Sequence, residues 1–427
     1  MGGVSRAAGL IATVVVAAAL AGCGSSGKGG PPTLSWYVFN EPSGSFKSAA
    51  DKCTKESNGR YKIAVQALPT DADQQRELIV RRLAAKDSSV DIIGMDVIWT
   101  AEFAQAGWIE PWTGAMAQQA TQGDLPGPLK TAQYKGKLYA APFTSNAQML
   151  FYRKDRVKAP PKTWDEMLAQ AKQIGANGKI QVQGARYEGL TVWFNSLINS
   201  AGGTILKPDG STVALGPPAV KAAAIIKNLA TSPAADPALE NNKEDQARLG
   251  FEAGNSSFEV NYTFAWASAT SAVDKAPDPA AKKKAIQFRD SIGFARWPSV
   301  DAGTPSHVTL GGINLGVGSY GKHKQLAFQA ALCLRQPVNQ IPASIKGGLL
   351  PTTASLFNDP QITKAFPFAS ILKAELADGV ARPVTPYYSD ISQAIQKSLH
   401  PETNIDPPNT IKDMESKLDR AKKGELF

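Results

Sequence analysis

The sequence predicts an α/β protein with two lobes, and three observations support this fold class. The chain has 427 residues, which is enough for two or three domains with a buried core. From Thr33 onward, apolar residues alternate between strand-like and helix-like spacing, which favours a mostly parallel sheet covered by helices on both faces. A helix-rich middle section separates two such stretches, so we expect the chain to leave the first lobe and later return to it.

The first lobe is expected to alternate strands and helices in chain order. We predict strands over residues 34–39, 61–68 and 90–95, and helices over residues 44–57 and 71–86 with a short helix through Phe103. Leu78, Ile79, Leu83 and Ala84 fall on one face of the second helix. Ligands meet open α/β sheets at the carboxyl ends of their strands, so the residues that follow these strands are candidate ligand contacts.

The middle section carries a clear helix start and several further helices. Thr163 is the expected N-cap of a helix, with Glu166 three residues later as its capping-box partner. Further helices fit residues 192–200, 217–230 and 242–252, and the first of them stops at Gly202-Gly203. Strand character over residues 306–317 and a helix over residues 322–334 then mark the return to the first lobe.

The N-terminal segment is typical of an export signal. A single charge at Arg6 precedes an apolar run that is too short to span a bilayer and ends at Leu20-Ala21-Gly22-Cys23. That ending resembles a bacterial lipobox, which implies a signal peptide over residues 1–22 and a lipid on Cys23; an uncleaved anchor helix is the alternative. Residues 23–32 read as a solvated tether. We therefore expect an exported protein that is anchored to the outer face of the cytoplasmic membrane.

Charge and cysteine content exclude several classes of function. The formal net charge is +9, but the basic residues are scattered among acidic ones apart from Lys282-Lys283-Lys284, so we expect no nucleic acid partner. With no CxxC pair and 3 histidines, we expect no metal site and no cofactor. Cys53 and Cys333 remain after Cys23. A disulfide between them is the economical interpretation in an exported chain, and two buried free thiols are the alternative.

Several stretches in order resemble the solute-binding proteins that serve carbohydrate ABC importers. They span nearly the whole chain after the tether, and comprise residues 90–96 with 103–109, 136–142 with 150–155, 161–166, 315–317 with 322–324, and 348–351. Within that family, Tyr187-Glu188-Gly189-Leu190 and residues 381–388 are similar to the trehalose and maltose binders, among them the trehalose-binding lipoproteins of mycobacteria.

The resemblance implies a two-lobe periplasmic-binding-protein fold with the ligand cleft between the lobes. Residues 33–143 and 308–350 would form the first lobe, residues 144–307 and 351–427 the second, and hinge crossings would fall near residues 142–145, 305–310 and 350–352. It also implies trehalose or a related α-linked glucose disaccharide as the ligand, permease subunits of an ABC importer as partners, and a monomeric protein without catalytic residues.

Candidate sugar contacts in the first lobe follow from the chemistry of a sugar, whose hydroxyls both donate and accept hydrogen bonds. Asn40, Glu41 and Asp96 end strands and should face the cleft, while Gln75 lies in the first turn of a helix and Asn146 follows a crossing. Asp96 also qualifies as a cap for the short helix that starts near Ile98. Gly312 would let the backbone approach the sugar, or would only permit a turn.

The second lobe should contribute an aromatic ring and a guanidinium group. If residues 258–267 form a strand, Tyr262, Phe264 and Trp266 share one face. The resemblance then selects Trp266 as the ring that stacks on the sugar, and a position in the core is the alternative. Arg382 and Tyr388 match the pattern of the trehalose binders, and an ordinary surface arginine is the alternative at Arg382.

The main competing interpretation is an exported glycoside hydrolase. Such an enzyme needs two carboxyl groups that flank one bond, which Glu41, Asp96 or Glu188 could supply. No GxSxG or HExxH motif occurs, and the residues at 316–321 that resemble a phosphate-binding loop lead to His323 where Ser or Thr is required. We therefore expect a binding protein and not an enzyme.

Overall fold

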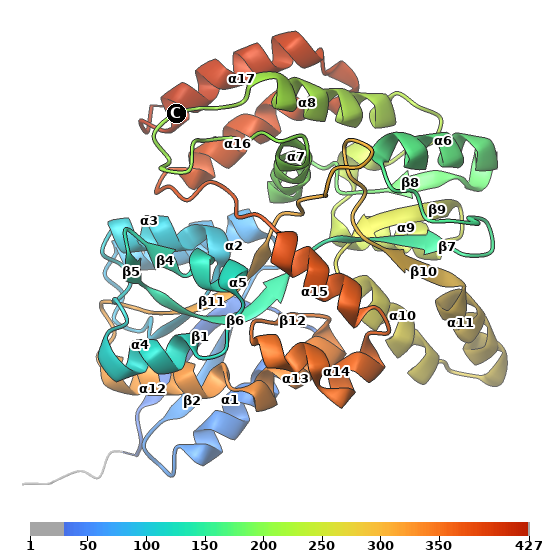
Figure 1. Ribbon diagram of the computed structural model, residues 1–427. Coiled ribbons are helices and arrows are strands. Elements are labelled where there is room, and N and C mark those ends of the chain that lie inside the picture. Colours follow the sequence, from blue (N-terminus) through green and yellow to red (C-terminus); the bar gives the residue numbers. More distant parts are fainter. Residues whose placement is uncertain (1–29, 426–427) are drawn as a thin grey trace, which may run out of the picture.

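The computed structural model describes residues 30–425 and arranges them as two lobes, each built on its own sheet (Figure 1). The first sheet has the strand order β12-β6-β11-β3-β1-β2, and the second has the order β10-β7-β9-β8. The predicted two-lobe α/β fold is therefore confirmed. The expected signal peptide, Cys23 and residues 23–29 of the expected tether lie outside the described residues. Among residues 30–425, none of the helices has the length and apolar character needed to cross a membrane.

The sheet of the first lobe is covered on both faces because its strands are apolar on both faces. Its parallel strands are β1 (Thr33–Phe39), β2 (Lys62–Leu68) and β3 (Ile92–Asp96). Along β1, Leu34, Trp36 and Val38 face one core with α1 (Ser45–Glu56) and α12 (Lys324–Leu334), whereas Tyr37 faces the other core with α2 (Ala72–Ala84) and α3 (Thr100–Gln105). This alternation follows from the two-residue period of a strand.

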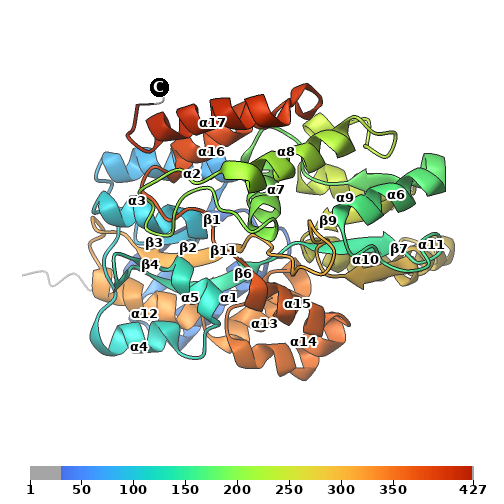
Figure 2. The ribbon, with the colours of Figure 1, turned by 45° about the horizontal axis from the view of Figure 1, so that its top comes forward.

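Shorter elements complete this lobe and lie below and beside its sheet in Figures 1 and 2. They are α4 (Gly114–Thr121), α5 (Pro126–Thr131), β4 (Gln133–Tyr134), β5 (Lys137–Leu138) and α13 (Pro337–Gly347). After β12 the chain continues through α14 (Pro360–Ala365) and α15 (Ala369–Asp378), and the buried residues Ile362, Leu372 and Leu376 of these helices belong to the core of the second lobe.

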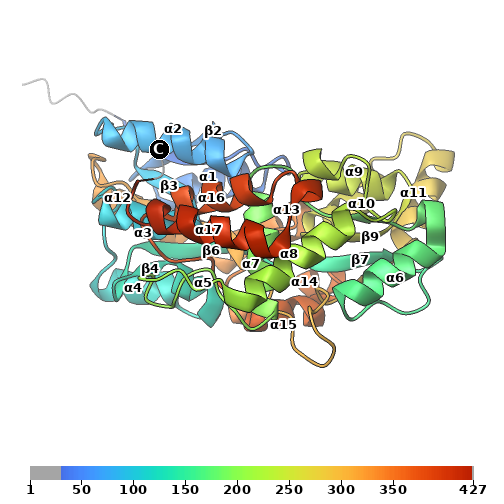
Figure 3. The ribbon, with the colours of Figure 1, turned by 90° about the horizontal axis from the view of Figure 1, so that it is seen from above.

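The second lobe combines a small sheet with a thick helical layer. Its strands are β7 (Met149–Arg153), β8 (Lys179–Gln181), β9 (Ser256–Asn261) and β10 (Ile292–Ala295). The helices around them are α6 (Trp164–Ile174), α7 (Glu188–Ser200), α8 (Gly216–Ala230), α9 (Glu244–Glu252), α10 (Phe264–Asp274) and α11 (Pro279–Ser291). Two C-terminal helices, α16 (Tyr388–Leu399) and α17 (Pro407–Ala421), pack against α7 and α8, and α17 lies beside α8 in the view from above (Figure 3). Helix α7 is buried on nearly all sides, which agrees with its apolar sequence.

The chain passes between the two sheets at strands that lie side by side. Strand β6 (Ala140–Asn146) belongs to the first sheet and leads directly into β7 of the second. The chain returns through β11 (Gly311–Val317), and it leaves again after β12 (Leu350–Pro351). Both strands pair with the end of β6, through Gly311 with Asn146 and Leu350 with Ser145. Three neighbouring segments therefore connect the lobes.

Most elements lie where the sequence predicts them, with three corrections. Residues 258–267 are not one strand, because β9 ends at Asn261 and α10 begins at Phe264. The returning strand is shorter than predicted and starts at Gly311. On α2, Ile79 and Leu83 are buried as the pattern implies, but Leu78 is 37% exposed.

The helix start at Thr163 is confirmed in its main feature. The Thr163 hydroxyl accepts a hydrogen bond from the Glu166 backbone N–H at 3.1 Å. The Glu166 carboxylate accepts its bond from the N–H of Lys162 at 2.7 Å, one residue before the capping-box position.

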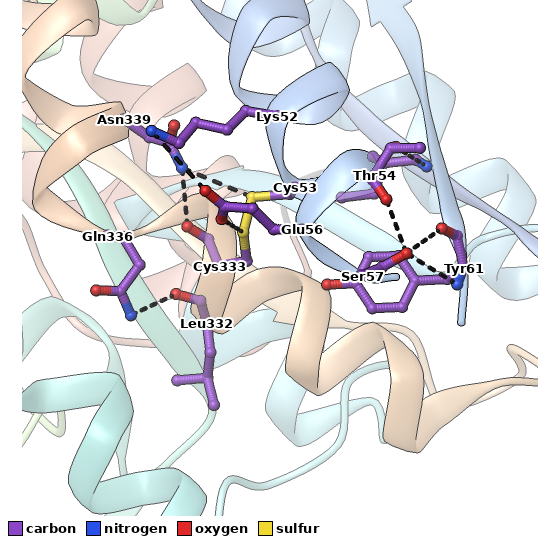
Figure 4. The surroundings of a disulfide bond; sticks show 11 residues. Lys52, Cys53, Thr54, Glu56, Ser57, Tyr61, Leu332, Cys333, Gln336 and Asn339 are labelled. Carbon is purple, nitrogen blue, oxygen red and sulfur yellow. Dashed lines mark hydrogen bonds and ion pairs between the residues drawn. A yellow bond between two sulfur atoms is a disulfide. The ribbon is translucent and has the colours of Figure 1, made fainter. Parts of the chain in front are cut away.

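The predicted disulfide between Cys53 and Cys333 is present and joins α1 to α12 in the first lobe (Figure 4). Cys53 is completely buried, and Asn339 donates a hydrogen bond to its sulfur at 3.6 Å. Within residues 30–425, these two cysteines and Glu56 are the one group whose donor atoms have metal-ligand spacing. The two sulfur atoms are bonded to each other, so neither is a thiolate that could bind a metal.

Candidate functional site

A cavity of about 930 Å³ lies between the lobes and is lined by residues of both. The first lobe contributes the ends of its strands, where Asn40 follows β1, Asp96 ends β3 and Asn146 ends β6. The second lobe contributes the first turns of α7 and α9 and one face of α10. The volume lies at the upper end of the range that is usual for small-molecule sites. The cavity is the candidate functional site.

Arg382 connects the two lobes at this cavity. Its Nη1 donates to Glu188 Oε1 of the second lobe at 2.7 Å, and its Nη2 donates to Asp96 Oδ1 of the first lobe at 3.1 Å. The side chain is buried, and burial opposes its charge, but the nearby groups Asp96, Tyr388 and Glu188 outweigh that effect and raise the pKa of Arg382. The guanidinium therefore stays charged in a desolvated place.

Glu188 is the first residue of α7 and is buried. Its Oε1 also accepts from the Tyr388 hydroxyl, and its Oε2 accepts from Ser392 Oγ at 2.6 Å. Burial raises the pKa of the Glu188 carboxyl, while the charge of Arg382 and the two hydroxyl hydrogen bonds oppose the rise. Tyr388 itself lies behind Glu188 and is not part of the cavity wall, so the structure makes it a supporting residue.

Asp96 combines the two roles that the sequence allows. Its Oδ1 accepts a hydrogen bond from the Ile98 backbone N–H at 3.2 Å, which caps the short helix Val97–Trp99, and the same oxygen accepts from Arg382. The carboxyl group lines the cavity from the first lobe.

The remaining residues predicted in the first lobe all line the cavity, but they differ in whether their side chains already have hydrogen-bond partners. Glu41 accepts from the N–H groups of Ser43 and Ser45 at 2.7 and 3.0 Å and thereby holds the turn before α1. Gln75 is buried and donates to the Thr70 carbonyl oxygen at 3.1 Å. Among residues 30–425, the side chains of Asn40 and Asn146 have no hydrogen-bond partner, so their amides are open to a ligand.

Gly312 lines the cavity, yet the sheet alone already requires a glycine there. Its φ is 138°, and a Cβ at this position would lie 2.2 Å from the Thr144 carbonyl oxygen of β6. Any other residue would therefore push apart two of the connecting segments.

Trp266 lies outside the cavity wall, contrary to expectation. Because α10 begins at Phe264, the side chain of Trp266 points to the opposite side of the helix from the cavity-lining residues. Its Nε1 donates to the Ala365 carbonyl oxygen at 2.8 Å, and its ring packs against Phe294 at a centroid distance of 5.0 Å. Tyr262, which directly follows β9, lines the cavity instead.

Sequence reasoning missed the contribution of α9 and of Tyr187. Lys243, which precedes α9, forms an ion pair with Asp71 at the start of α2 and lies 4.9 Å above the Tyr187 ring. Tyr187 and Lys243 both line the cavity. The available signal was the acidic and basic run at residues 243–248, which reads as an ordinary solvated helix face when no partner lobe is known.

Several acidic residues lie close together where the two lobes meet, and they affect one another's pKa values. Asp73, in the first turn of α2, has a pKa raised to about 7 by burial and by the charges of Glu188, Asp71 and Asp96. Since Asp71 and Asp73 belong to the first lobe and Glu188 to the second, approach of the lobes brings like charges together, and the cations Arg382 and Lys243 offset this repulsion.

Comparisons with known proteins agree with this geometry. A family model described as "Bacterial extracellular solute-binding protein" matches residues 40–340. The curated "Probable ABC transporter-binding protein" of Deinococcus radiodurans is 29% identical over 398 residues, which is 88% of this chain and 90% of that protein. The maltose-bound structure of T. maritima MalE3 is 25% identical, with a TM-score of 0.81 over 91% of this chain and 99% of that chain. The GacH receptor of Streptomyces glaucescens, solved unliganded and with acarbose, shares the fold at 19% identity, with a TM-score of 0.78 over 92% and 99% of the two chains.

Proposed function

The chain belongs to the bacterial extracellular solute-binding protein family and is a binding protein and not an enzyme; from that premise we propose that it binds an α-linked glucose disaccharide, with trehalose as the first candidate. The observation that carries the proposal is the cavity between the lobes, with Arg382 held between Asp96 and Glu188. The maltose found in the MalE3 structure and the acarbose found with GacH support a glucose-type ligand with α-linkages.

The lining matches the two kinds of surface that a sugar presents. Asn40, Asn146 and Asp96 offer amide and carboxylate groups to its hydroxyls from the first lobe, and Arg382 offers guanidinium N–H groups between the lobes. Tyr262 offers an aromatic ring to a C–H face from the second lobe. A sugar bound in this way contacts both lobes only when they are closed, so its binding favours the closed form.

The proposed role is delivery of the sugar to the permease of an ABC importer. The name of the Deinococcus relative supports a transporter partner. In this proposal the protein is a monomer, is held at the outer face of the cytoplasmic membrane by a lipid on Cys23, and presents the closed form to the permease.

Calorimetry with trehalose, maltose, sucrose and glucose tests the ligand. We expect saturable binding of trehalose and weaker or no binding of glucose, which offers fewer hydroxyls to the two lobes. Prolonged incubation with trehalose should release no glucose, because Asp96 and Glu188 both pair with one arginine. If none of the disaccharides binds, the proposed ligand class is rejected.

A further inference from the structure

We propose that Glu188 is a positioning residue for ligand binding: it fixes Arg382 to the second lobe, so that closure delivers the guanidinium to Asp96 and to the bound molecule. The proposal rests on the function proposed above. Arg382 lies in an irregular segment between α15 and α16, and no helix or strand sets the direction of its side chain. Nearby, the backbone of Val380 pairs with Val308 and Leu310, which belong to the segment that returns to the first lobe. The backbone thus runs along a connection between the lobes. Side-chain contacts therefore determine which lobe the guanidinium stays with when the lobes open.

The contact with the second lobe is the stronger of the two. The Arg382–Glu188 pair has side-chain exposures of 3% and 6% and a distance of 2.7 Å. The Arg382–Asp96 pair is longer, at 3.1 Å, and its carboxylate is 21% exposed. Charge-assisted hydrogen bonds gain strength when they are short and desolvated. On opening of the lobes, the bond to Glu188 is therefore retained and the bond to Asp96 is lost.

Glu188 acts through Arg382 because its own oxygen atoms are occupied. Oε1 accepts from Arg382 and Tyr388, and Oε2 accepts from Ser392. Ser392 is held in turn by Thr191 at 2.9 Å and by Gln396 at 3.0 Å. Tyr388 and Ser392 both belong to α16, which packs against α7, the helix of Glu188 itself, so the carboxylate has a rigid base.

A double-mutant cycle tests the proposal, with trehalose as the probe. We expect Glu188→Gln to lower trehalose affinity roughly tenfold or more in the wild-type background and by less than about twofold in the Arg382→Ala background. Leu399→Ala is the matched control, because it removes buried packing from the same helix α16 and takes away none of the hydrogen bonds that hold Glu188 or Arg382. It should lower the melting temperature and leave the affinity unchanged. Unchanged affinity in Glu188→Gln, or an equal loss in both backgrounds, would overturn the proposal.

A second readout needs no ligand and stays valid if trehalose is the wrong sugar or if Glu188→Gln fails to fold. In protein labelled with ¹⁵N-arginine, the guanidinium signals of Arg382 are identified by their loss in Arg382→Ala. We expect slow rotation of this group, with resolved Nη signals, in the wild type and in Asp96→Asn. Fast rotation in the ligand-free wild type, or loss of the resolved signals in Asp96→Asn, would show that Glu188 does not hold the side chain. Failure of trehalose to bind, with slow rotation preserved, would reject the ligand and leave the positioning role intact.

Discussion

At the scale of single residues, Arg382 is the side chain on which most of the site depends. We predict that Arg382→Ala weakens trehalose binding by about 2–4 kcal/mol, or roughly 30- to 1000-fold, because it removes the guanidinium donors and leaves Asp96 and Glu188 without their cationic partner in a desolvated cleft. Arg382→Lys should restore only part of the loss, since one ammonium cannot reproduce the planar fork that reaches both carboxylates. Calorimetry measures the trehalose affinity of both variants, and circular dichroism checks that they fold. Wild-type affinity in a folded Arg382→Ala protein would contradict the prediction.

Two neighbouring aromatic residues should separate binding from stability. We predict that Tyr262→Ala lowers trehalose affinity roughly tenfold, because it removes a ring from the cavity wall. Trp266→Ala should leave the affinity within about twofold and lower the melting temperature, because its ring packs against Phe294 and Phe368. Calorimetry and differential scanning calorimetry on the same two proteins provide the comparison. The reverse result would place the stacking ring at Trp266 after all.

At the scale of the elements, the short helix Glu402–Asn404 between α16 and α17 contains a buried acid. The Glu402 side chain has no exposed surface, and neither carboxylate oxygen has a hydrogen-bond partner among residues 30–425. Burial raises the pKa of Glu402 from 4.5 to about 8. The native state therefore holds this proton more tightly than the unfolded state does.

The sign of the pH effect follows from linkage. The contribution of Glu402 to stability is fully present below pH 4.5 and is lost as the pH rises toward about 8. We predict that Glu402→Gln, which stays neutral, becomes more stable relative to the wild type between pH 5 and pH 8, by on the order of 1–3 kcal/mol. Urea unfolding of both proteins at the two pH values measures this difference. A difference that does not change with pH would mean that the acid does not titrate in the native state.

The disulfide is the covalent link between α1 and α12. It joins residues that are 280 positions apart. By the chain-entropy model, such a bond stabilises the folded state by at most about 5 kcal/mol. We predict that Cys53→Ser combined with Cys333→Ser lowers the melting temperature but leaves trehalose affinity unchanged, because the bond lies away from the cavity wall. Alkylation of the unreduced protein followed by mass spectrometry should label neither cysteine. Labelling of both would contradict the bond.

At the scale of the whole molecule, anchoring and binding should be independent. We predict that Cys23→Ala moves the protein from the membrane fraction to the medium and leaves trehalose affinity unchanged, because residues 23–32 separate the lipid-accepting cysteine from the folded body. Cell fractionation followed by calorimetry on the released protein measures both quantities. A variant that stays with the membrane would count against lipid attachment at Cys23.

The two-lobe α/β fold, most element positions and the disulfide could be predicted from the amino-acid sequence. The spacing of apolar residues identifies strands and helices because burial of one face dictates that spacing. It also indicated Asn40 and Asp96 as cavity-lining residues, because strand ends of an α/β sheet converge at one edge, and Asn146, because it follows a crossing that the family resemblance implies. These features depend on local pattern and on general rules of sheet architecture.

Which side chains meet between the lobes depends on long-range packing and is seen in the structure alone. Glu188 and Arg382 are 194 residues apart in the chain, and their ion pair depends on how α7, α16 and the connecting segments pack. Residues 262–266 alternate aromatic and small side chains, a pattern that fits a strand. In the structure a helix begins at Phe264 instead, so Trp266 packs against the core and Tyr262 lines the cavity. Local periodicity determines the elements, whereas the contacts across the cleft arise from long-range packing that no short stretch of sequence encodes.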